Sequence, residues 1–363
     1  YVQGKTSDTV SAASGTKFDG VVWSMSGGVL TISKGTATDE YAAGEMGEVR
    51  SYEAWRSRDD EITKVIVEEG VKNIGDYALS YMPNAVEVEI ADSVESIGLQ
   101  AFRESTAMTS VELGEGIKEI GQEAFLLCSS LTEIEIPGSV KTIGQGAFRE
   151  CEALTSVKFN EGLEHVEQYA FRYCANLAQI DFPSTVKTVG EEAVYGTAAY
   201  NAQSENEFII CGSVLIGTNV NEFDIDHPCI IPEGVVCIAN KVFVDVTITS
   251  LTLPESLKYI GNFAFDGGMR NDYQCDKTLT ELDLKNVEYI GTKAFQYWRY
   301  IKDVDLSNVY TPSSAVASRI FPLSTITAIC PGPTSIALFS EMIPVGVVLR
   351  TIKVSLSKFS HCI

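Results

Sequence analysis

Apolar residues recur along this chain at a fixed interval of 23 residues. The segment V-x-x-I-G-x-x-A-F begins at six positions with that spacing, which are Val71, Val94, Ile117, Val140, Leu163 and Val186. A period in this range is typical of a solenoid, in which stacked coils bury their apolar faces only against their neighbours. The pattern therefore predicts one stack of about ten coils, built as an extended surface. Such an architecture favours binding over catalysis.

Each coil is expected to combine two extended stretches with one turn. Residues 131–136 alternate apolar and polar positions, which predicts a strand with Ile134 and Ile136 facing inward. A short V-K-x-I-G run follows as a second extended stretch, and the next residues predict one helical turn that directs Ala124 and Phe125 into the core. The expected fold class is thus a β-rich α/β solenoid with a parallel sheet on its concave face, short helical turns opposite, and caps at both ends.

A glycine recurs after the second stretch of most coils, as at Gly121 and Gly144. Glycine permits a positive φ and also a close approach of two backbones, and the sequence leaves both explanations open. Glu167 and Ala239 replace this glycine in two copies, so the requirement is not absolute.

The repeat boundaries divide the chain into four segments. Residues 1–17 read as a polar linker of the kind that follows a removed export signal. Residues 18–70 are expected to form an N-terminal β cap, because two short alternating strands flank a glycine pair there. The solenoid fills 71–310, with an insertion at 195–234 in which FIICGSVLIG predicts a hairpin. Residues 311–363 lose the repeat signature and are expected to form a divergent C-terminal cap.

The chain is strongly acidic, since 27 basic residues stand against 49 acidic ones and give a net charge of −22. A body of this charge repels phosphate backbones and anionic membrane surfaces, so we expect no nucleic acid partner and no membrane partner. No uninterrupted apolar run reaches the ~18 residues of a membrane helix, so no membrane insertion is expected.

The positions of the cysteine and histidine residues indicate a structural role and not a metal-binding or catalytic one. Cys128, Cys151 and Cys174 share one repeat position, and such a column is best explained as reduced, buried small side chains. No C-x-x-C motif occurs and the three histidines are scattered, so neither a metal site nor a cofactor is expected. The common nucleophile, nucleotide-binding and metalloprotease motifs are also missing from the sequence, so we expect no catalytic residues and no enzyme.

The outward positions of the strands carry the candidate binding residues. Neighbouring strands lie ~4.8 Å apart, so carboxylates at these positions form stripes of like charge, interrupted near Lys158. Like charges directly opposite one another destabilise a sheet, which favours a role in binding a basic protein or a divalent cation. The alternative is that these charges only keep an exposed sheet soluble. The candidate ligand-binding residues are Glu87, Glu89, Glu112, Glu133, Glu135, Lys158, Asp181, Glu281, Asp283, Asp303 and Asp305.

The repeat consensus V-x-x-I-G-x-x-A-F-x-x-C-x-x-L-x-x-I-x-I-P resembles that of the BspA-like leucine-rich repeat family of bacterial surface proteins, and residues 117–137 and 140–151 match it closely. The opening W-S-M-S-G-G-V-L-T-I-S and the F-I-I-C-G-S-V-L-I-G segment also resemble modules of these proteins. The resemblance implies a leucine-rich repeat solenoid in an extracellular or cell-surface protein, with adhesion to host or microbial ligands.

Three functional hypotheses remain. The first is a non-catalytic secreted or cell-surface protein whose solenoid binds a protein or glycan ligand on a host or microbial surface. The second is a structural spacer or surface-layer component without a ligand of its own. The third, ranked last, is a carbohydrate-active enzyme. Its sugar would need exposed aromatic residues, and the dense sequence cluster of Tyr297, Trp298 and Tyr300 is explained more simply by core or cap packing.

Overall fold

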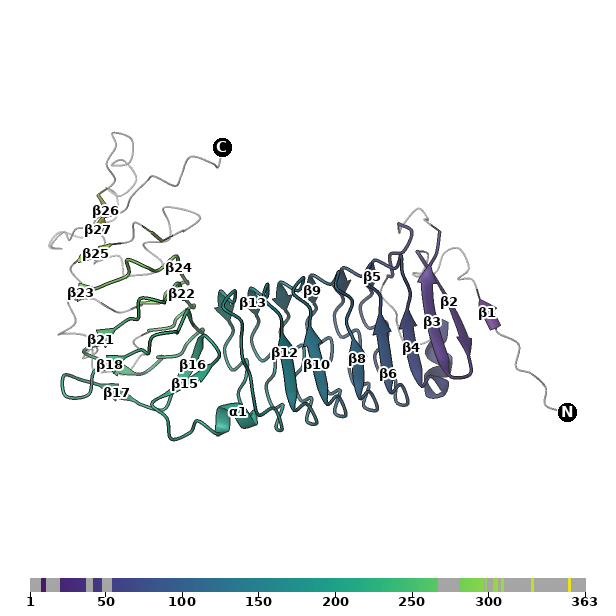
Figure 1. Ribbon diagram of the computed structural model, residues 1–363, viewed down its shortest axis with the longest axis horizontal. Coiled ribbons are helices and arrows are strands. Elements are labelled where there is room, and N and C mark those ends of the chain that lie inside the picture. The colour runs from purple at the N-terminus through teal and green to yellow at the C-terminus, as the bar shows by residue number, and fades with distance from the viewer. Residues whose placement is uncertain are drawn as a thin grey trace. The chain divides into compact units, whose positions relative to one another are not determined.

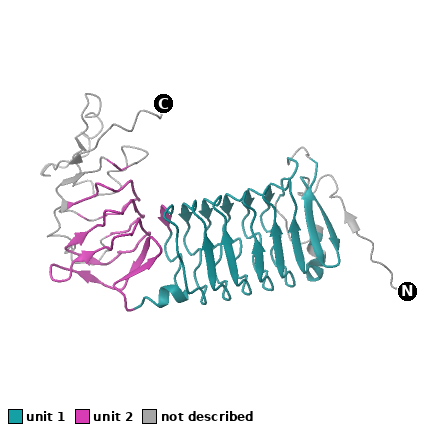
Figure 2. Cartoon of the chain, in the orientation of Figure 1, with its two compact units in different colours: residues 1–186, 190–204 teal, residues 187–189, 205–363 magenta. Residues whose placement is uncertain are grey.

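The computed structural model describes residues 8–10, 20–36, 42–47, 54–266, 281–296, 298, 303–305, 308–309, 328–329 and 352–353. The chain forms two compact units (Figure 2). The first unit comprises residues 1–186 and 190–204, and the second comprises 187–189 and 205–363. The sequence predicts a single stack over 71–310. Along the chain the second unit begins at residue 205, inside the predicted insertion, and it also includes residues 187–189.

The first unit is built from coils that place longer strands on one side and short strands on another, with parallel pairing between strands of successive coils. The longer strands are β4 (Lys64–Val67), β6 (Glu87–Ile90), β8 (Ser110–Glu112), β10 (Glu133–Ile136) and β12 (Ser156–Phe159). The short strands are β5 (Asn73–Ile74), β7 (Ser96–Ile97), β9 (Glu119–Ile120), β11 (Thr142–Ile143) and β13 (His165–Val166). Strands β4, β6 and β8 lie side by side in this order (Figure 1). Val65 pairs with Val88 and Val88 with Val111, so the ladder register equals the sequence period.

An antiparallel hairpin covers the start of the repeats, as the sequence predicts. It joins β2 (Val21–Ser26) to β3 (Val29–Lys34), and β3 then pairs in parallel with β4. Strand β1 (Asp8–Val10) pairs with β2. The 3-10 segment η1 (Ala54–Glu61) brings in Trp55, which is fully buried, donates its indole N–H to the carbonyl of Ala78 at 3.1 Å, and packs edge-on against Trp23.

The third side of each coil is a ladder of turns, and the predicted helical turn is wrong. Residues with positive φ recur four apart on this side, as at Glu123 (53°) and Leu127 (61°). A right-handed helix contains no such residue. Alternate amides donate to carbonyls of the following coil: Glu123 to Gln145 at 2.8 Å, Phe125 to Ala147 at 2.7 Å and Leu127 to Arg149 at 3.0 Å.

The remaining amides of this segment close turns within the coil. Ala124, Leu126 and Cys128 each donate to the carbonyl three residues earlier. Every amide from Glu123 to Cys128 is therefore paired. A left-handed φ costs a non-glycine residue roughly 1–2 kcal/mol, and leaving a buried amide unpaired costs a similar amount. The strained turns persist because they bring alternate amides within reach of the next coil.

The core of the first unit is arranged in columns of equivalent residues. Phe102, Phe125, Phe148 and Phe171 stack with ring centroids 4.9, 5.1 and 5.1 Å apart and ring planes within 5° of parallel. Their side chains are at most 1% exposed. Because each ring touches the next, burial of one coil depends on both of its neighbours.

The thiol column lies beside these rings. Cys128, Cys151 and Cys174 are free and buried, which confirms the sequence prediction. Each Sγ lies 3.0–3.2 Å from the carbonyl oxygen of a phenylalanine in the preceding coil, so each thiol has a hydrogen-bond acceptor. Ser105 holds the same position one coil earlier, and its Oγ donates to the carbonyl of Leu79 at 3.0 Å.

The recurrent glycine is required for close approach of adjacent coils. Gly121 and Gly144 do not have positive φ. A Cβ added to Gly121 would lie 2.6 Å from the carbonyl oxygen of Ile97 and 2.8 Å from the backbone of Gly98. Steric exclusion by the preceding coil therefore settles the two explanations that the sequence leaves open.

The second unit opens with the predicted hairpin. Strand β15 (Phe208–Cys211) pairs antiparallel with β16 (Val214–Thr218), and the parallel order continues through β19 (Cys237–Ile238), β22 (Tyr259–Ile260) and β24 (Tyr289–Ile290). Strand β14 (Thr188–Val189) also belongs to this unit. Two strand pairs flank this sheet: β17 (Glu222–Phe223) with β20 (Thr247–Ile248), and β18 (Cys229–Ile230) with β21 (Leu251–Thr252).

The later part of the second unit keeps the columnar core. Phe243, Phe265 and Phe295 stack in the same way, and Trp298 packs edge-on against the last two rings. Trp298 is 2% exposed, so it is a core residue, whereas Tyr297 and Tyr300 lie outside the described residues. One further sheet contains, in order, β23 (Glu281–Leu282), β25 (Asp303–Asp305), β27 (Ile352–Lys353) and β26 (Ala328–Ile329). Strands β26 and β27 are the described part of the predicted C-terminal cap.

Regular helix is almost absent from the described residues. One α-helix, α1 (Ala198–Asn201), ends the first unit, and the Oγ of Thr197 accepts a hydrogen bond from the amide of Tyr200 at its start. No helix in the described part of the chain is long and apolar enough to cross a bilayer.

The glycine contact predicts a large difference between two substitutions. Gly121→Ala should lower the free energy of unfolding by roughly 1–3 kcal/mol, because its Cβ would press on the preceding coil. Gly146→Gln should cost less, because an added Cβ would meet only ordinary contacts of 3.5 Å or more. Its repeat equivalents Gln100 and Glu123 also carry side chains at the same positive φ. Denaturant titration of both variants tests this, and equal losses would contradict the steric explanation.

The thiol column predicts slow labelling in the native protein. Burial raises the pKa of Cys128 and Cys151 far above the usual range, so the reactive thiolate is scarce near neutral pH. Reaction with a thiol reagent should be slow until denaturant is added, and Cys151→Ser should be well tolerated because Ser105 already fills this position. Rapid native labelling, or a mapped disulfide within the column, would contradict the structure.

Candidate functional site

On the outward face of the longer strands, a lysine of β4 lies between two carboxylates of β6. Lys64 Nζ lies 2.5 Å from Glu89 Oε1 and 3.0 Å from Glu87 Oε2. Hydrogen bonds to Glu89 and then to Glu87 raise the pKa of Lys64 above its ordinary value. One lysine therefore compensates both predicted candidates on β6.

The next outward carboxylate has no such cation. Glu112 pairs directly across the β6–β8 ladder with Glu89, and no ion pair to Glu112 occurs among the described residues. Glu135 holds the equivalent position of the following coil, on β10. Within the described strands, the ladder does not continue from β8 to β10. Like charges directly opposite one another weaken strand pairing, and the sheet is interrupted where Glu112 and Glu135 follow each other.

Beyond the interruption the charges are partly compensated. Lys158 Nζ lies 2.6 Å from Glu135 Oε1, and Asn160 Nδ2 donates to the same oxygen at 2.9 Å. These contacts, the lysine first, lower the pKa of Glu135 below its ordinary value. Gln179 donates to Asp181 at 2.5 Å. Glu133 on β10 faces Ser156 and, like Glu112, has no cationic partner in the described part of the chain.

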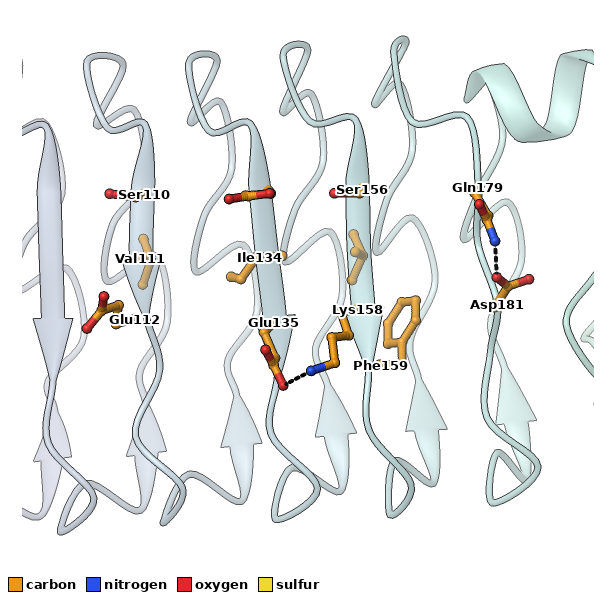
Figure 3. A pocket seen from close by; sticks show the side chains of 12 residues that line it. Ser110, Val111, Glu112, Ile134, Glu135, Ser156, Lys158, Phe159, Gln179 and Asp181 are labelled. Atoms are coloured by element: carbon orange, nitrogen blue, oxygen red, sulfur yellow. Dashed lines mark hydrogen bonds and ion pairs between the residues drawn. The ribbon is translucent and has the colours of Figure 1, made fainter.

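A groove of about 660 Å³ lies over this interruption and will be called the acidic groove (Figure 3). Its lining combines two rows of side chains. The outward row supplies Glu112, Glu133, Glu135, Lys158 and Asp181, together with Ser110, Ser156 and Gln179. The inward row supplies the apolar side chains of Val111, Ile134, Val157 and Phe159.

The acidic groove gathers five of the sequence-predicted residues, namely Glu112, Glu133, Glu135, Lys158 and Asp181. Glu87 and Glu89 belong to the same unit but lie outside the lining. In the second unit, Asp283 is exposed and pairs with Lys285 at 3.3 Å. The backbones of Glu281 and Asp303 are in register on β23 and β25, while the side chains of Glu281, Asp303 and Asp305 lie outside the described part.

Sequence reasoning missed the apolar part of the groove. Alternation along the strands places Val111, Ile134 and Val157 inward, and these side chains are indeed only 7%, 4% and 8% exposed. Phe159 is half-buried, although its equivalent Ile136 in the preceding coil is fully buried. No sequence signal marks the place where the ladder opens beside them.

The lining of the groove combines negative charge with apolar side chains. Among the described residues, no group of three or more His, Cys, Asp or Glu side chains is placed to hold a metal ion. The groove offers fixed carboxylates beside apolar side chains. It can therefore attract a cationic group and cover its hydrocarbon part at the same time.

Comparison with known proteins finds one family. Residues 72–201 and 227–336 match the BspA type leucine rich repeat region in six copies. The comparison with curated proteins finds no significant match.

Several solved structures of bacterial leucine-rich repeat proteins are similar at low identity. A leucine rich cell surface protein from Faecalibacterium prausnitzii is 20% identical, with 96% of each chain covered and a TM-score of 0.40. A leucine-rich repeat protein from Eubacterium ventriosum is 20% identical over 82% of this chain and 72% of its own, with a TM-score of 0.39. The pneumococcal vaccine antigen PcpA is 20% identical over 82% of both chains, with a TM-score of 0.38. Because its repeats match over more than half of its length, the chain belongs to the family of BspA-type leucine-rich repeat proteins.

Proposed function

We propose that this chain is a non-catalytic surface or secreted protein that binds a basic segment of a partner protein in its acidic groove. The observation that carries the proposal is the pair Glu112 and Glu133, two carboxylates without cationic partners in the described residues, beside apolar side chains in one groove. Membership of the repeat family and the net charge of −22 support it.

The placement of lysines along the strands supports a binding role for the carboxylates that have no cationic partner in the described residues. Lys64 compensates two carboxylates at one side and Lys158 compensates Glu135 at the other. Between them Glu112 stands opposite Glu89 across the ladder. An arrangement that weakens pairing is retained at one place, where a bound cation would relieve the repulsion.

The groove fits a lysine or arginine side chain in both its charge and its apolar surface. Such a side chain carries its charge at the end of a hydrocarbon stem that packs on apolar surface. The stem would lie against Val111 and Ile134, while the charged end reaches Glu112 and Glu133. An arginine would add a planar pair of donors that matches a carboxylate.

The same lining argues against hydrolysis. Ser110 and Ser156 are the hydroxyl groups in the groove, and no histidine lines it to act as their base. All charged groups there except Lys158 are carboxylates on an open surface.

The unpaired carboxylate is predicted to reduce stability. Glu112→Gln should raise Tm slightly, because it removes the repulsion from Glu89, and the gain should shrink at high salt. Glu95→Gln is the matched control, since Glu95 precedes the short strand β7, is paired with Lys118 and should gain nothing. Thermal unfolding at two salt concentrations measures both variants. A lower Tm for Glu112→Gln would show that this carboxylate stabilises the free protein.

Charge reversal tests the binding proposal directly. The triple variant Glu112→Lys, Glu133→Lys and Glu135→Lys should weaken binding of a lysine- and arginine-rich probe peptide by about tenfold or more. Wild-type affinity should also fall steeply between low and high salt, because exposed charges are screened beyond ~8 Å at physiological ionic strength. Titration calorimetry with the peptide measures both effects.

A second triple variant controls for net charge. Glu115→Lys, Glu119→Lys and Glu152→Lys change the charge equally at exposed positions outside the groove. Binding by this variant should stay close to wild type. Equal loss in both triple variants would reduce the effect to nonspecific attraction, and no binding of the peptide by the wild type would overturn the proposal.

A further inference from the structure

A second surface of the first unit gathers aromatic residues from the turn ladder. Tyr169 and Tyr173 come from one coil, and Tyr195 and Tyr200 from the segment that follows in the next. We call these four residues with Arg172 the tyrosine cluster. Tyr173 is 42% and Tyr195 40% exposed, and apart from these two, Tyr81 is the one other exposed aromatic residue in the described part of the chain.

Arg172 lies at the centre of the tyrosine cluster. Its guanidinium carbon is 4.7 Å from the ring centroid of Tyr173, 5.0 Å from that of Tyr169 and 5.8 Å from that of Tyr195. Its terminal nitrogens lie 3.0 Å from the hydroxyl of Tyr173 and 3.1 Å from Oε2 of Glu192. The cation is thus already compensated by a carboxylate and by ring faces, so the cluster together with Glu192 carries no net charge.

The arginine column shows how this arrangement departs from the repeat. Arg103 and Arg149 hold the equivalent position in earlier coils, and each pairs with the glutamate that follows it, at 3.0 Å to Glu104 and 2.7 Å to Glu150. At the next residue after Arg172 the chain has Tyr173 instead. Solubility and local pairing would be served by glutamate, so an exposed tyrosine directly after the arginine is a departure from the coils of Arg103 and Arg149.

The rings are held in place before any ligand binds. Tyr173 lies against Gly196, where an added Cβ would be 2.6 Å from its ring, and Gly196 has a φ of 78°. Tyr195 packs edge-on between Tyr173 at 6.0 Å and Tyr200 at 5.4 Å, measured between ring centroids. Tyr200 is fixed by helix α1, and burial raises the pKa of its hydroxyl, so it stays protonated at neutral pH. Rigid aromatic side chains lose little entropy on binding.

From this geometry we infer that the tyrosine cluster is a binding site for a neutral glycan. The C–H faces of a pyranose ring carry partial positive charge and stack on aromatic faces, which are negative. The hydroxyls of the same sugar can pair with Glu192 and with the phenol groups, which accept and donate hydrogen bonds. A charge-neutral aromatic surface on a chain of net charge −22 suits an uncharged ligand, whereas a basic protein would be drawn to the acidic groove.

The test uses the whole chain and a panel of immobilised neutral oligosaccharides built from glucose, mannose, galactose and N-acetylhexosamines, followed by calorimetry with the strongest ligand. Tyr173→Ala combined with Tyr195→Ala should weaken that binding by about tenfold or more. Tyr195→Ser alone should also weaken it, and it keeps the test valid if the double variant is unstable, because Ser80 already occupies this repeat position. Affinity should change little with salt.

Tyr81→Ala is the matched control. Tyr81 holds the same repeat position as Tyr173 and is 48% exposed, but the residue before it is Ser80 and not an arginine. This variant should bind like the wild type. No binding to any panel member at millimolar concentration, or binding that the cluster variants leave unchanged, would overturn the inference. If the same variants reduced binding only to a protein, the cluster would be a protein contact and the glycan site would be rejected. Each of these outcomes is independent of the acidic groove, which the probe peptide tests separately.

Discussion

Backbone pairing between successive coils is the interaction on which the rest of this protein depends. Within the first unit it operates on three sides of the coil: through the longer strands, the short strands and the turn ladder. The turn ladder is the most demanding, because it holds non-glycine residues such as Glu123 and Leu127 at positive φ. Where all three sides pair, a coil is fixed against the next in one register, and a shift would break all three ladders at once. Between β8 and β10 the longer strands form no ladder, and the short strands and the turn ladder continue the pairing.

Fixed register turns positions in the repeat into columns in space. Inside, the columns are rings and thiols, in which equivalent residues touch from coil to coil. On the outer surface, the fixed register places like charges of successive coils next to one another, although repulsion alone would keep them apart. The acidic groove and the tyrosine cluster are both places where one column changes residue type: Glu112 follows Glu89 without a new lysine, and Tyr173 replaces the glutamate that follows Arg103 and Arg149. In the account proposed here, binding specificity would be encoded by local departures from the repeat.

Much of the fold was predictable because strand alternation and the repeat period can be recognised from the sequence alone. The inward Ile134, the buried thiols, the two hairpins and five residues of the groove all follow from them. The turn ladder was not predictable, since Glu123 and Leu127 are not residues that normally mark a positive φ, and the A-F spacing fits a helical turn equally well. The sequence also does not indicate where the second compact unit begins, because recovery of the repeat at Val235 says nothing about the packing of the coils on either side.

The tyrosine cluster illustrates a signal that was present but hidden. Its tyrosines are dispersed over residues 169–200, so a search for dense aromatic runs finds Tyr297, Trp298 and Tyr300 instead, and Trp298 proves to be core. Aligning the coils by their period would have placed Tyr195 directly after Arg172 in one column, next to the column of Tyr173. In repeat proteins, residues at equivalent positions of successive coils are neighbours in space, so a search for clusters has to compare coils as well as residues adjacent in sequence.

Amide hydrogen exchange at single-residue resolution tests the central claim most directly. The amides of Phe125 and Leu127, which donate to the following coil, should exchange as slowly as those of strand β10, because each opens only when neighbouring coils separate. The amide of Ala124, which closes a turn within its own coil, should be protected to the same degree if the whole segment opens as one unit. Exchange of Phe125 and Leu127 at the rate of an open surface turn, with β10 still protected, would show that the turn ladder does not hold the coils together.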